Sequence, residues 1–158
     1  MNRRDFIKAT GLVAVAGLTG VAGCIAGAEE SDPYADRFML DNEPDYQGWF
    51  NGVGNYNGTL DLRGGQEVNV RVGVKGGLGF YKFGPPAIAV SPGTTVRWEW
   101  MGKGGSHDVV AEKKGFKSKL TAEKGFVFKH TFDSPGIYKY YCTPHKGMGM
   151  KGAVYVLE

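Results

Sequence analysis

The stretch from Tyr141 to Met150 holds the densest set of soft donor atoms in the chain. Cys142 offers a thiol, His145 an imidazole three residues later, and Met148 and Met150 offer thioethers six and eight residues after the thiol. Thiolate and thioether ligands favour Cu(I), whereas imidazole suits both Cu(I) and Cu(II). The donors in this stretch therefore predict a site that holds copper in both oxidation states.

A second imidazole would complete a trigonal plane of two histidines and one cysteine with a weak axial methionine, the geometry of an electron-transfer copper site. The chain has three histidines. His107 lies where a glycine-rich loop gives way to an apolar run, which is the start of a predicted strand. His130 lies within a strand-like alternation and is predicted to have a structural role. The predicted ligands are His107, Cys142, His145 and Met150, and no catalytic residue is predicted.

Several segments resemble the plastocyanin-like blue copper proteins, and most of all the halocyanins. The resemblance covers about residues 46 to 158 and is strongest over roughly the last seventy. The segments that carry it are Tyr140–His145, Gly149–Met150, Ser106–Val110, Pro92–Val96 with Trp98, Trp49–Phe50 and Asn55–Thr59. The resemblance implies a cupredoxin fold, with one copper ion held by the four predicted ligands. It also favours Met150 over Met148 as the axial ligand.

Two features depart from the pattern of these families. Asp108 stands where plastocyanin-like proteins usually carry an asparagine that bridges the two ligand loops, so the bridging hydrogen bond is in question. Halocyanins are typically acidic, whereas residues 97–151 hold eleven basic and five acidic side chains. Residues 24–96 hold five basic and nine acidic side chains. The predicted copper-bearing half is thus the basic half of the chain.

Residues 1–23 are predicted to be a signal peptide that directs export. Asn2–Lys8 resembles a twin-arginine signal, and the apolar run that follows ends at Gly23 and is shorter than the roughly twenty residues that a membrane-spanning helix needs. Cys24 follows as the predicted site of lipidation, which makes the protein a lipoprotein. The alternatives are an uncleaved signal anchor and a disulfide between Cys24 and Cys142.

Residues 24–45 are polar, acidic and without periodicity, and are predicted to be a flexible tether to the membrane. Residues 46–158 are long enough for one domain with its own core. Their period-two alternation and frequent turns predict an all-β, Greek-key sandwich of about seven to eight strands. The strands are expected at residues 67–74, 87–90, 94–101, 109–111, 126–132, 136–141 and 153–157.

Together these features predict a membrane-anchored, monomeric carrier of single electrons on the outer face of the cytoplasmic membrane. Its expected partners are membrane-bound or extracytoplasmic redox proteins with acidic docking surfaces, and its Cys24 lipid enters the bilayer. Nucleic acid is disfavoured by the export signal. The alternative is a copper storage, sensing or delivery module. An oxidase or nitrite reductase is disfavoured because a catalytic copper needs further histidines, and only His130 is spare.

Overall fold

Strict alternation of buried and partly exposed side chains runs along the strand β5 (Thr94–Trp100), so that Val96, Trp98 and Trp100 all point to one side. These three side chains have no exposed surface in the computed structural model, which describes residues 32–158. Side chains at alternate positions of a strand lie on opposite faces of its sheet. The inward face of β5 therefore supplies the centre of the core.

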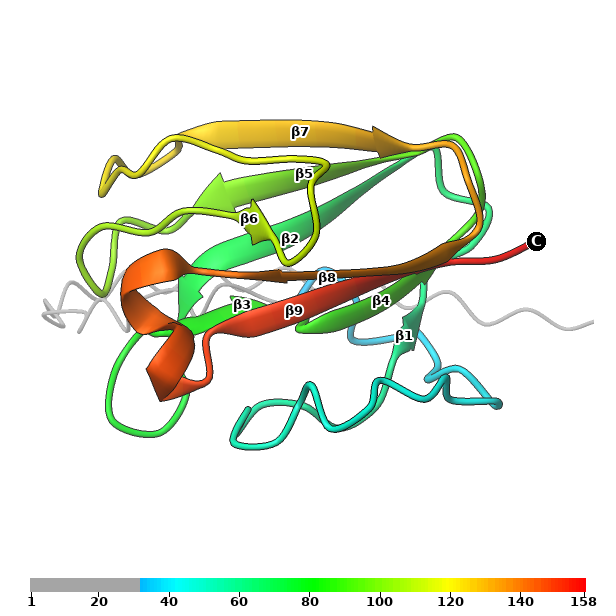
Figure 1. Ribbon diagram of the computed structural model, residues 1–158, viewed down its shortest axis with the longest axis horizontal. Coiled ribbons are helices and arrows are strands. Elements are labelled where there is room, and N and C mark those ends of the chain that lie inside the picture. The colour runs from blue at the N-terminus through cyan, green and yellow to red at the C-terminus, as the bar shows by residue number, and fades with distance from the viewer. Residues whose placement is uncertain (1–31) are drawn as a thin grey trace, which may run out of the picture. The chain divides into compact units, whose positions relative to one another are not determined.

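Nine strands form two sheets in the described part of the chain (Figure 1). One sheet has the order β1-β4-β9-β8-β6 and the other the order β3-β2-β5-β7. The remaining strands are β1 (Leu60–Asp61), β2 (Glu67–Val74), β3 (Lys82–Gly84), β4 (Ala87–Val90), β6 (Val110–Ala111), β7 (Val127–Phe132), β8 (Gly136–Tyr141) and β9 (Lys151–Val156). From β4 onward the chain passes from one sheet to the other at each step until β8. This confirms the predicted all-β sandwich.

The short strands β1 and β3 were not predicted, because two or three residues are too few to show alternation. Residues 143–148 form a 3-10 helix, η1 (Thr143–Met148), which was not predicted either. The loops after β2 and β5 and the helix η1 gather at one end of the sandwich, at the left of Figure 1. Segments far apart in the sequence meet at this end.

The segment Tyr46–Tyr56 packs its aromatic side chains on the outer face of the five-stranded sheet. Trp49 and Phe50 are buried there against Ala153 of β9 and Ala87 of β4. The Trp49 indole N–H donates to the Gly152 carbonyl at 2.9 Å. This outer layer is a second apolar cluster, separate from the core between the sheets.

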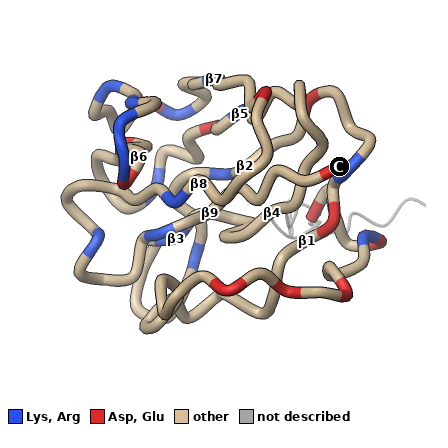
Figure 2. Tube along the Cα trace, turned by 45° about the vertical axis from the view of Figure 1, so that its right-hand side comes forward, with Lys and Arg blue, Asp and Glu red and all other residues tan. Residues whose placement is uncertain are grey.

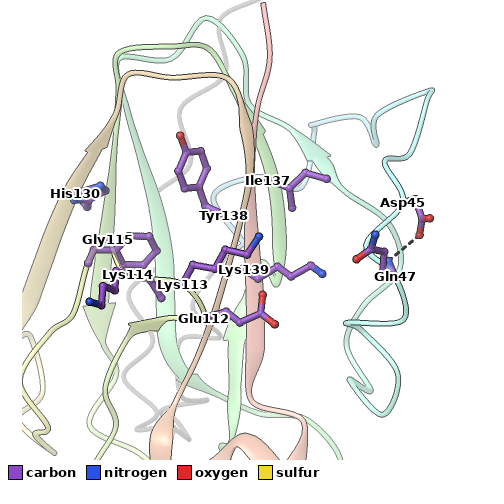
Figure 3. A pocket seen from close by; sticks show the side chains of 12 residues that line it. Asp45, Gln47, Glu112, Lys113, Lys114, Gly115, His130, Ile137, Tyr138 and Lys139 are labelled. Carbon is purple, nitrogen blue, oxygen red and sulfur yellow. Dashed lines mark hydrogen bonds between the residues drawn. The ribbon is translucent and has the colours of Figure 1, made fainter.

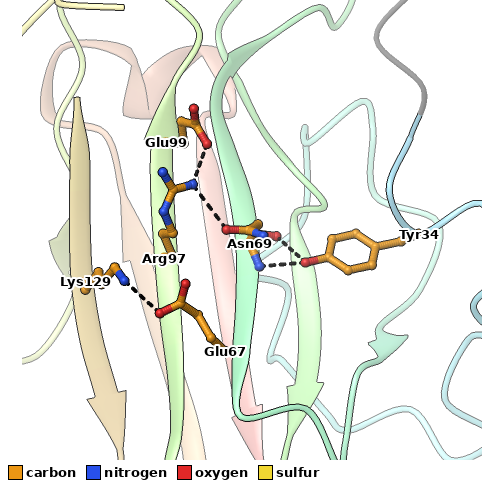
Figure 4. Close-up of polar contacts among 6 residues, drawn as sticks. All are labelled: Tyr34, Glu67, Asn69, Arg97, Glu99 and Lys129. Carbon is orange, nitrogen blue, oxygen red and sulfur yellow. Dashed lines mark hydrogen bonds and ion pairs between the residues drawn. The ribbon is translucent and has the colours of Figure 1, made fainter. Parts of the chain in front are cut away.

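Part of the stretch predicted as a flexible tether contacts the sandwich. The compact unit begins at Tyr34, whose hydroxyl accepts from the Asn69 amide N–H at 2.6 Å and donates to the Asn69 carbonyl at 3.0 Å (Figure 4). Further on, the Glu43 carboxylate accepts from the amide N–H of Thr59 at 3.1 Å and from its hydroxyl at 2.6 Å. The segment from Tyr34 to Asp45 therefore belongs to the folded unit. The predicted signal peptide and Cys24 lie outside the described residues.

Charged side chains cover the outer face of the four-stranded sheet (Figure 4). Lys129 of β7 pairs with Glu67 of β2 at 2.7 Å, and Arg97 pairs with Glu99 on β5. Arg97 also donates to the Asn69 side chain at 3.3 Å. Exposed pairs of this kind contribute little to stability, and they mark this face as solvated.

Candidate metal centre

Three of the four predicted ligands meet at the end of the sandwich where the loops gather. The Cys142 sulfur lies 3.4 Å from Nδ1 of His145 and 3.7 Å from Nδ1 of His107. The two histidine Nδ1 atoms are 3.1 Å apart. Donor atoms from segments 35 residues apart in the sequence thus face one another, in an arrangement suited to a type 1 copper site.

His107 is held so that one particular ring nitrogen faces the other donors. Its Nε2 lies 2.7 Å from the Lys103 carbonyl, so Nε2 carries the proton and Nδ1 keeps its lone pair. The His107 backbone N–H donates to the Thr121 carbonyl at 2.9 Å, and the His107 carbonyl accepts from the Thr121 N–H at 3.0 Å. The same carbonyl accepts from the Trp100 indole N–H at 3.1 Å. The side chain is almost fully buried. The imidazole is oriented before any metal arrives.

Two glycines leave room for the His107 ring. A Cβ at Gly73 would lie 2.6 Å from the Lys103 carbonyl and 3.1 Å from Nε2 of His107, and one at Gly104 would lie 2.5 Å from the Phe80 carbonyl. Both glycines have positive φ angles, of 86° and 80°. Any other residue at either position would collide with the backbone beside the imidazole.

Cys142 and Met150 are joined through their backbones at the two ends of the ligand loop. The Cys142 N–H donates to the Met150 carbonyl at 3.1 Å, and the Met150 N–H donates to the His145 carbonyl at 3.1 Å. Both side chains are fully buried. The helix η1 between them ends at Gly149, which has a left-handed backbone conformation. Met148, the methionine that the resemblance disfavours as the axial ligand, is 54% exposed.

The carboxylate of Asp108 bridges the two ligand loops. One of its oxygens accepts from the Thr143 amide N–H at 2.6 Å, and the other accepts from the Thr143 hydroxyl at 2.8 Å. The hydrogen bond between the two ligand loops is therefore present, although Asp108 stands where plastocyanin-like proteins usually carry asparagine. The bridge places a negative charge beside the backbone of Cys142.

Burial sets the protonation of the three donors. Desolvation raises the pKa of the Cys142 thiol to about 12. A backbone hydrogen bond from Asp108 opposes this shift, and the charge of the Asp108 carboxylate adds to it. Desolvation lowers the pKa of His107. Desolvation also lowers the pKa of His145, and the neighbouring His107 lowers it further. At neutral pH the imidazoles are neutral and ready to bind, whereas the thiol must lose its proton to a metal ion.

A buried lysine beneath the ligand loop was not predicted. The Lys82 ammonium donates to the carbonyls of Met148 and Gly149, at 2.6 and 3.2 Å, and the residue is only 5% exposed. Desolvation lowers its pKa, as does the charge of Lys151. A charged residue in the apolar run from Phe80 to Phe83 was the one sign of it in the sequence.

His130 is not part of the donor cluster of the other two histidines, and its structural role stays a prediction. Its ring packs against Phe116 and Phe132, with centroid distances of 4.9 and 4.8 Å. It lines a cavity of about 400 Å³ that opens between β7 and β8 (Figure 3). Lysines 113, 114 and 139 line the same cavity.

These features define the protein as a β-sandwich with a copper centre of two histidines, a cysteine and a methionine-bearing loop at one end. The profile of the copper binding proteins of the plastocyanin/azurin family matches residues 68–157. The chain belongs to this family, and copper is its cofactor.

Two relatives, a halocyanin and a plastocyanin, agree with this assignment. The chain is 40% identical to a halocyanin from Natronomonas pharaonis, over 99% of this chain and 98% of that protein. It is 34% identical to a plastocyanin from Prochlorothrix hollandica, over 63% of this chain and 82% of that protein. Among solved structures, oxidised plastocyanin from Dryopteris crassirhizoma aligns with a TM-score of 0.45 and 30% identity, over 57% of this chain and all of that one.

Proposed function

We propose that the protein is a mononuclear blue copper protein that carries single electrons between redox partners. Its proposed ligands are His107, Cys142, His145 and Met150. The observation that carries the proposal is the convergence of the thiol and two imidazoles in a site whose backbone is already fixed. When bound, copper supplies a one-electron couple, and this chain supplies donors suited to both of its oxidation states.

The alternative of storage or delivery fits the burial less well. A site that hands over its ion needs ligands that a recipient can reach. Here Cys142 and Met150 are fully buried and His107 is 1% exposed, so the only predicted ligand with substantial exposure is His145. A buried, braced site favours retention of the ion.

An exposed edge of His145 is the proposed port for electrons. Its ring lies 4.5 Å, centroid to centroid, from the ring of Tyr81. Pro144, Gly147 and Met148 are exposed around it and offer a weakly hydrated contact. Transient redox encounters bury little area, so a small apolar patch of this kind suffices. The exposed Lys103 and Lys146 are proposed to rim it and to attract an acidic partner.

Cellular placement is proposed from the first 24 residues. A twin-arginine signal would export the folded protein, and a lipid on Cys24 would hold it at the outer face of the cytoplasmic membrane. In the described part of the chain, no helix is long and apolar enough to cross a membrane. If the apolar run of the signal is cleaved or is too short to hold the protein, the Cys24→Ala protein should be exported and released. Retention of this variant in the membrane fraction would favour an uncleaved anchor.

The decisive experiment is the absorption spectrum and redox titration of the copper-loaded protein. An intense blue band that bleaches and returns over one-electron cycles supports the carrier. Cys142→Ser should abolish the band, because a serine hydroxyl is a poor donor where the thiolate bonds to the metal. A colourless or irreversible wild-type protein would instead support storage or delivery. A variant that stays blue would overturn the assignment of Cys142 as a ligand.

A further inference from the structure

Three lysine side chains converge on one indole ring beside the copper centre. The ammonium groups of Lys139, Lys146 and Lys151 lie 5.6, 5.7 and 5.2 Å from the centre of the Trp49 ring. Lys146 also lies 4.1 Å from the centre of the Tyr141 ring. These five residues are called the Trp49–lysine cluster.

The cluster is assembled from four separate parts of the chain. Trp49 comes from the aromatic segment on the outer face of the five-stranded sheet, Lys139 and Tyr141 from β8, Lys146 from η1 and Lys151 from β9. Tyr141 and Lys151 are directly opposite each other in the β8–β9 ladder. Lys139 lies two residues before Tyr141, so it shares the same face of the sheet.

Like charges held this close repel one another, and nothing acidic in the described structure pairs with them. The ion pairs among residues 32–158 all use other side chains. Attraction between each ammonium and the aromatic faces offsets part of the repulsion. Burial lowers the pKa of the nearby Lys82, and the charge of Lys151 lowers it further. The cluster therefore has positive charge that an external anion would neutralise.

Simple coverage of an aromatic side chain does not account for this arrangement. Lysine stems do cover apolar surface while their ammonium groups stay in water. Trp49 is 8% exposed with the lysines in place, and it also packs against Ala87, Ala153 and its own segment. Coverage by apolar stems does not require the ammonium groups themselves to gather at the ring, yet three of them lie 5.2 to 5.7 Å from its centre. Figure 2 shows the wider setting, with basic positions on the loops at the left and many acidic ones along the lower edge and at the right.

We propose that the Trp49–lysine cluster is the docking site for a carboxylate-rich segment of a protein redox partner. This inference rests on the proposed electron-carrier function, and it places the partner beside His145 because Lys146 is the next residue. A flat anionic bilayer fits less well, since Asp45 lines the same cavity as Lys139 and would be brought against the lipid headgroups.

The test uses the copper(I) protein, which is diamagnetic, and a blocked hexaglutamate peptide as the acidic probe. At low ionic strength the ¹H–¹⁵N cross-peak of the Trp49 indole should move as peptide is added. The indole peaks of Trp98 and Trp100, which are fully buried, serve as internal references and should stay in place. Salt near 1 M should abolish the shift, because the Debye length falls to about 3 Å.

Two double variants that remove the same charge distinguish peptide binding by the cluster from binding caused by the overall positive charge of the protein. Lys139→Gln with Lys151→Gln should weaken peptide binding about tenfold at low salt, because two of the three attracting charges are lost. Lys75→Gln with Lys124→Gln removes the same charge from exposed loops of the other sheet and should change binding less than about twofold. Circular dichroism checks that both proteins are folded.

Each other outcome overturns the proposal. A Trp49 peak that does not move, or equal weakening by both pairs of variants, would show that the cluster is not an acidic docking site. Binding to phosphatidylglycerol vesicles without binding to the peptide would assign the cluster to a membrane surface. The electron-carrier function is tested separately, by the reversible blue band. If the protein binds the peptide but lacks that band, the electron-carrier function is wrong, while the acidic docking site still stands.

Discussion

The carboxylate of Asp108 accepts two hydrogen bonds from Thr143, one from its amide N–H and one from its hydroxyl. Asp108 directly follows His107, and Thr143 directly follows Cys142. The bridge therefore fixes the distance between the two ligand-bearing loops. It also fixes a negative charge near the Cys142 sulfur and two imidazoles, which an asparagine would not do.

Replacing Asp108 by asparagine should separate these two effects. The amide oxygen can still accept from the Thr143 N–H, and the amide nitrogen can donate to the Thr143 hydroxyl. Loss of the charge should raise the reduction potential by an amount on the order of tens of millivolts, because a nearby negative charge favours Cu(II). Spectroelectrochemistry measures this. Asp108→Ala breaks both bonds and should lower the free energy of unfolding by about 1–3 kcal/mol. A potential unchanged in Asp108→Asn would show that the charge is screened from the site.

Lys82 should act on the reduction potential in the opposite direction. Its ammonium lies under the ligand loop, bound to the Met148 and Gly149 carbonyls. Lys82→Met keeps the volume of the stem but removes the charge, so the potential should fall by tens of millivolts. Amide exchange at Gly149 and Met150 in the copper-free protein should also speed up, because the loop loses its donor. Lys75→Met, at an exposed position, is the control. If amide exchange in the ligand loop speeds up but the reduction potential does not change, the role of Lys82 is only structural.

Substitution of the two methionines of the ligand loop should have very different effects on the reduction potential. Met150 is fully buried at the end of the loop, and Met148 is more than half exposed. Met150→Leu should keep copper and colour but shift the reduction potential, because an axial thioether bond is long and weak and tunes electronics more than affinity. Met148→Leu should change the potential little. The opposite pattern in a redox titration would assign the axial position to Met148.

Copper binding should release about one proton per ion near neutral pH. Burial raises the pKa of the Cys142 thiol to about 12, so the copper-free protein keeps that proton. The pKa values of His107 and His145 are lowered, so both imidazoles are already neutral and release none. Titration of a weakly buffered sample with Cu²⁺ and a pH indicator measures the release. Release near zero would mean that the thiolate is already formed without metal, while the Cys142→Ser protein should release none.

Acid should destabilise the copper-free protein in part through His130. Desolvation lowers the pKa of His130, with Asp133 opposing the shift, so the unfolded chain takes up a proton at a higher pH than the folded protein does. Stability is therefore full above the ordinary histidine pKa of about 6.5 and declines as the pH falls below it. His130→Phe should retain more of its stability between about pH 6.5 and 5 than wild type does. Urea titrations at several pH values test this, and parallel declines in the two proteins would contradict it.

Much of the fold and the donor set could be predicted from the sequence alone. Period-two alternation marked the strands at 67–74 and 94–100, because one face of each strand is buried against the opposite sheet. The spacing of Cys142, His145 and Met150 predicted a single ligand loop, since neighbours in sequence must remain neighbours in space. The family followed from the same segments. Charge asymmetry along the chain was likewise visible without coordinates.

Long-range relationships were decided only by the tertiary structure. The sequence could not show that Lys82 reaches the carbonyls beneath the ligand loop, because 66 residues separate it from Met148. It could not show that Lys139, Lys146 and Lys151 meet over Trp49, since that depends on the β8–β9 register and on a segment about a hundred residues earlier folding over the sheet. Nor could it show that Asp108 bridges to Thr143. Sequence patterns record which face of a strand is buried, whereas contacts between charged groups depend on how the sheets and loops pack.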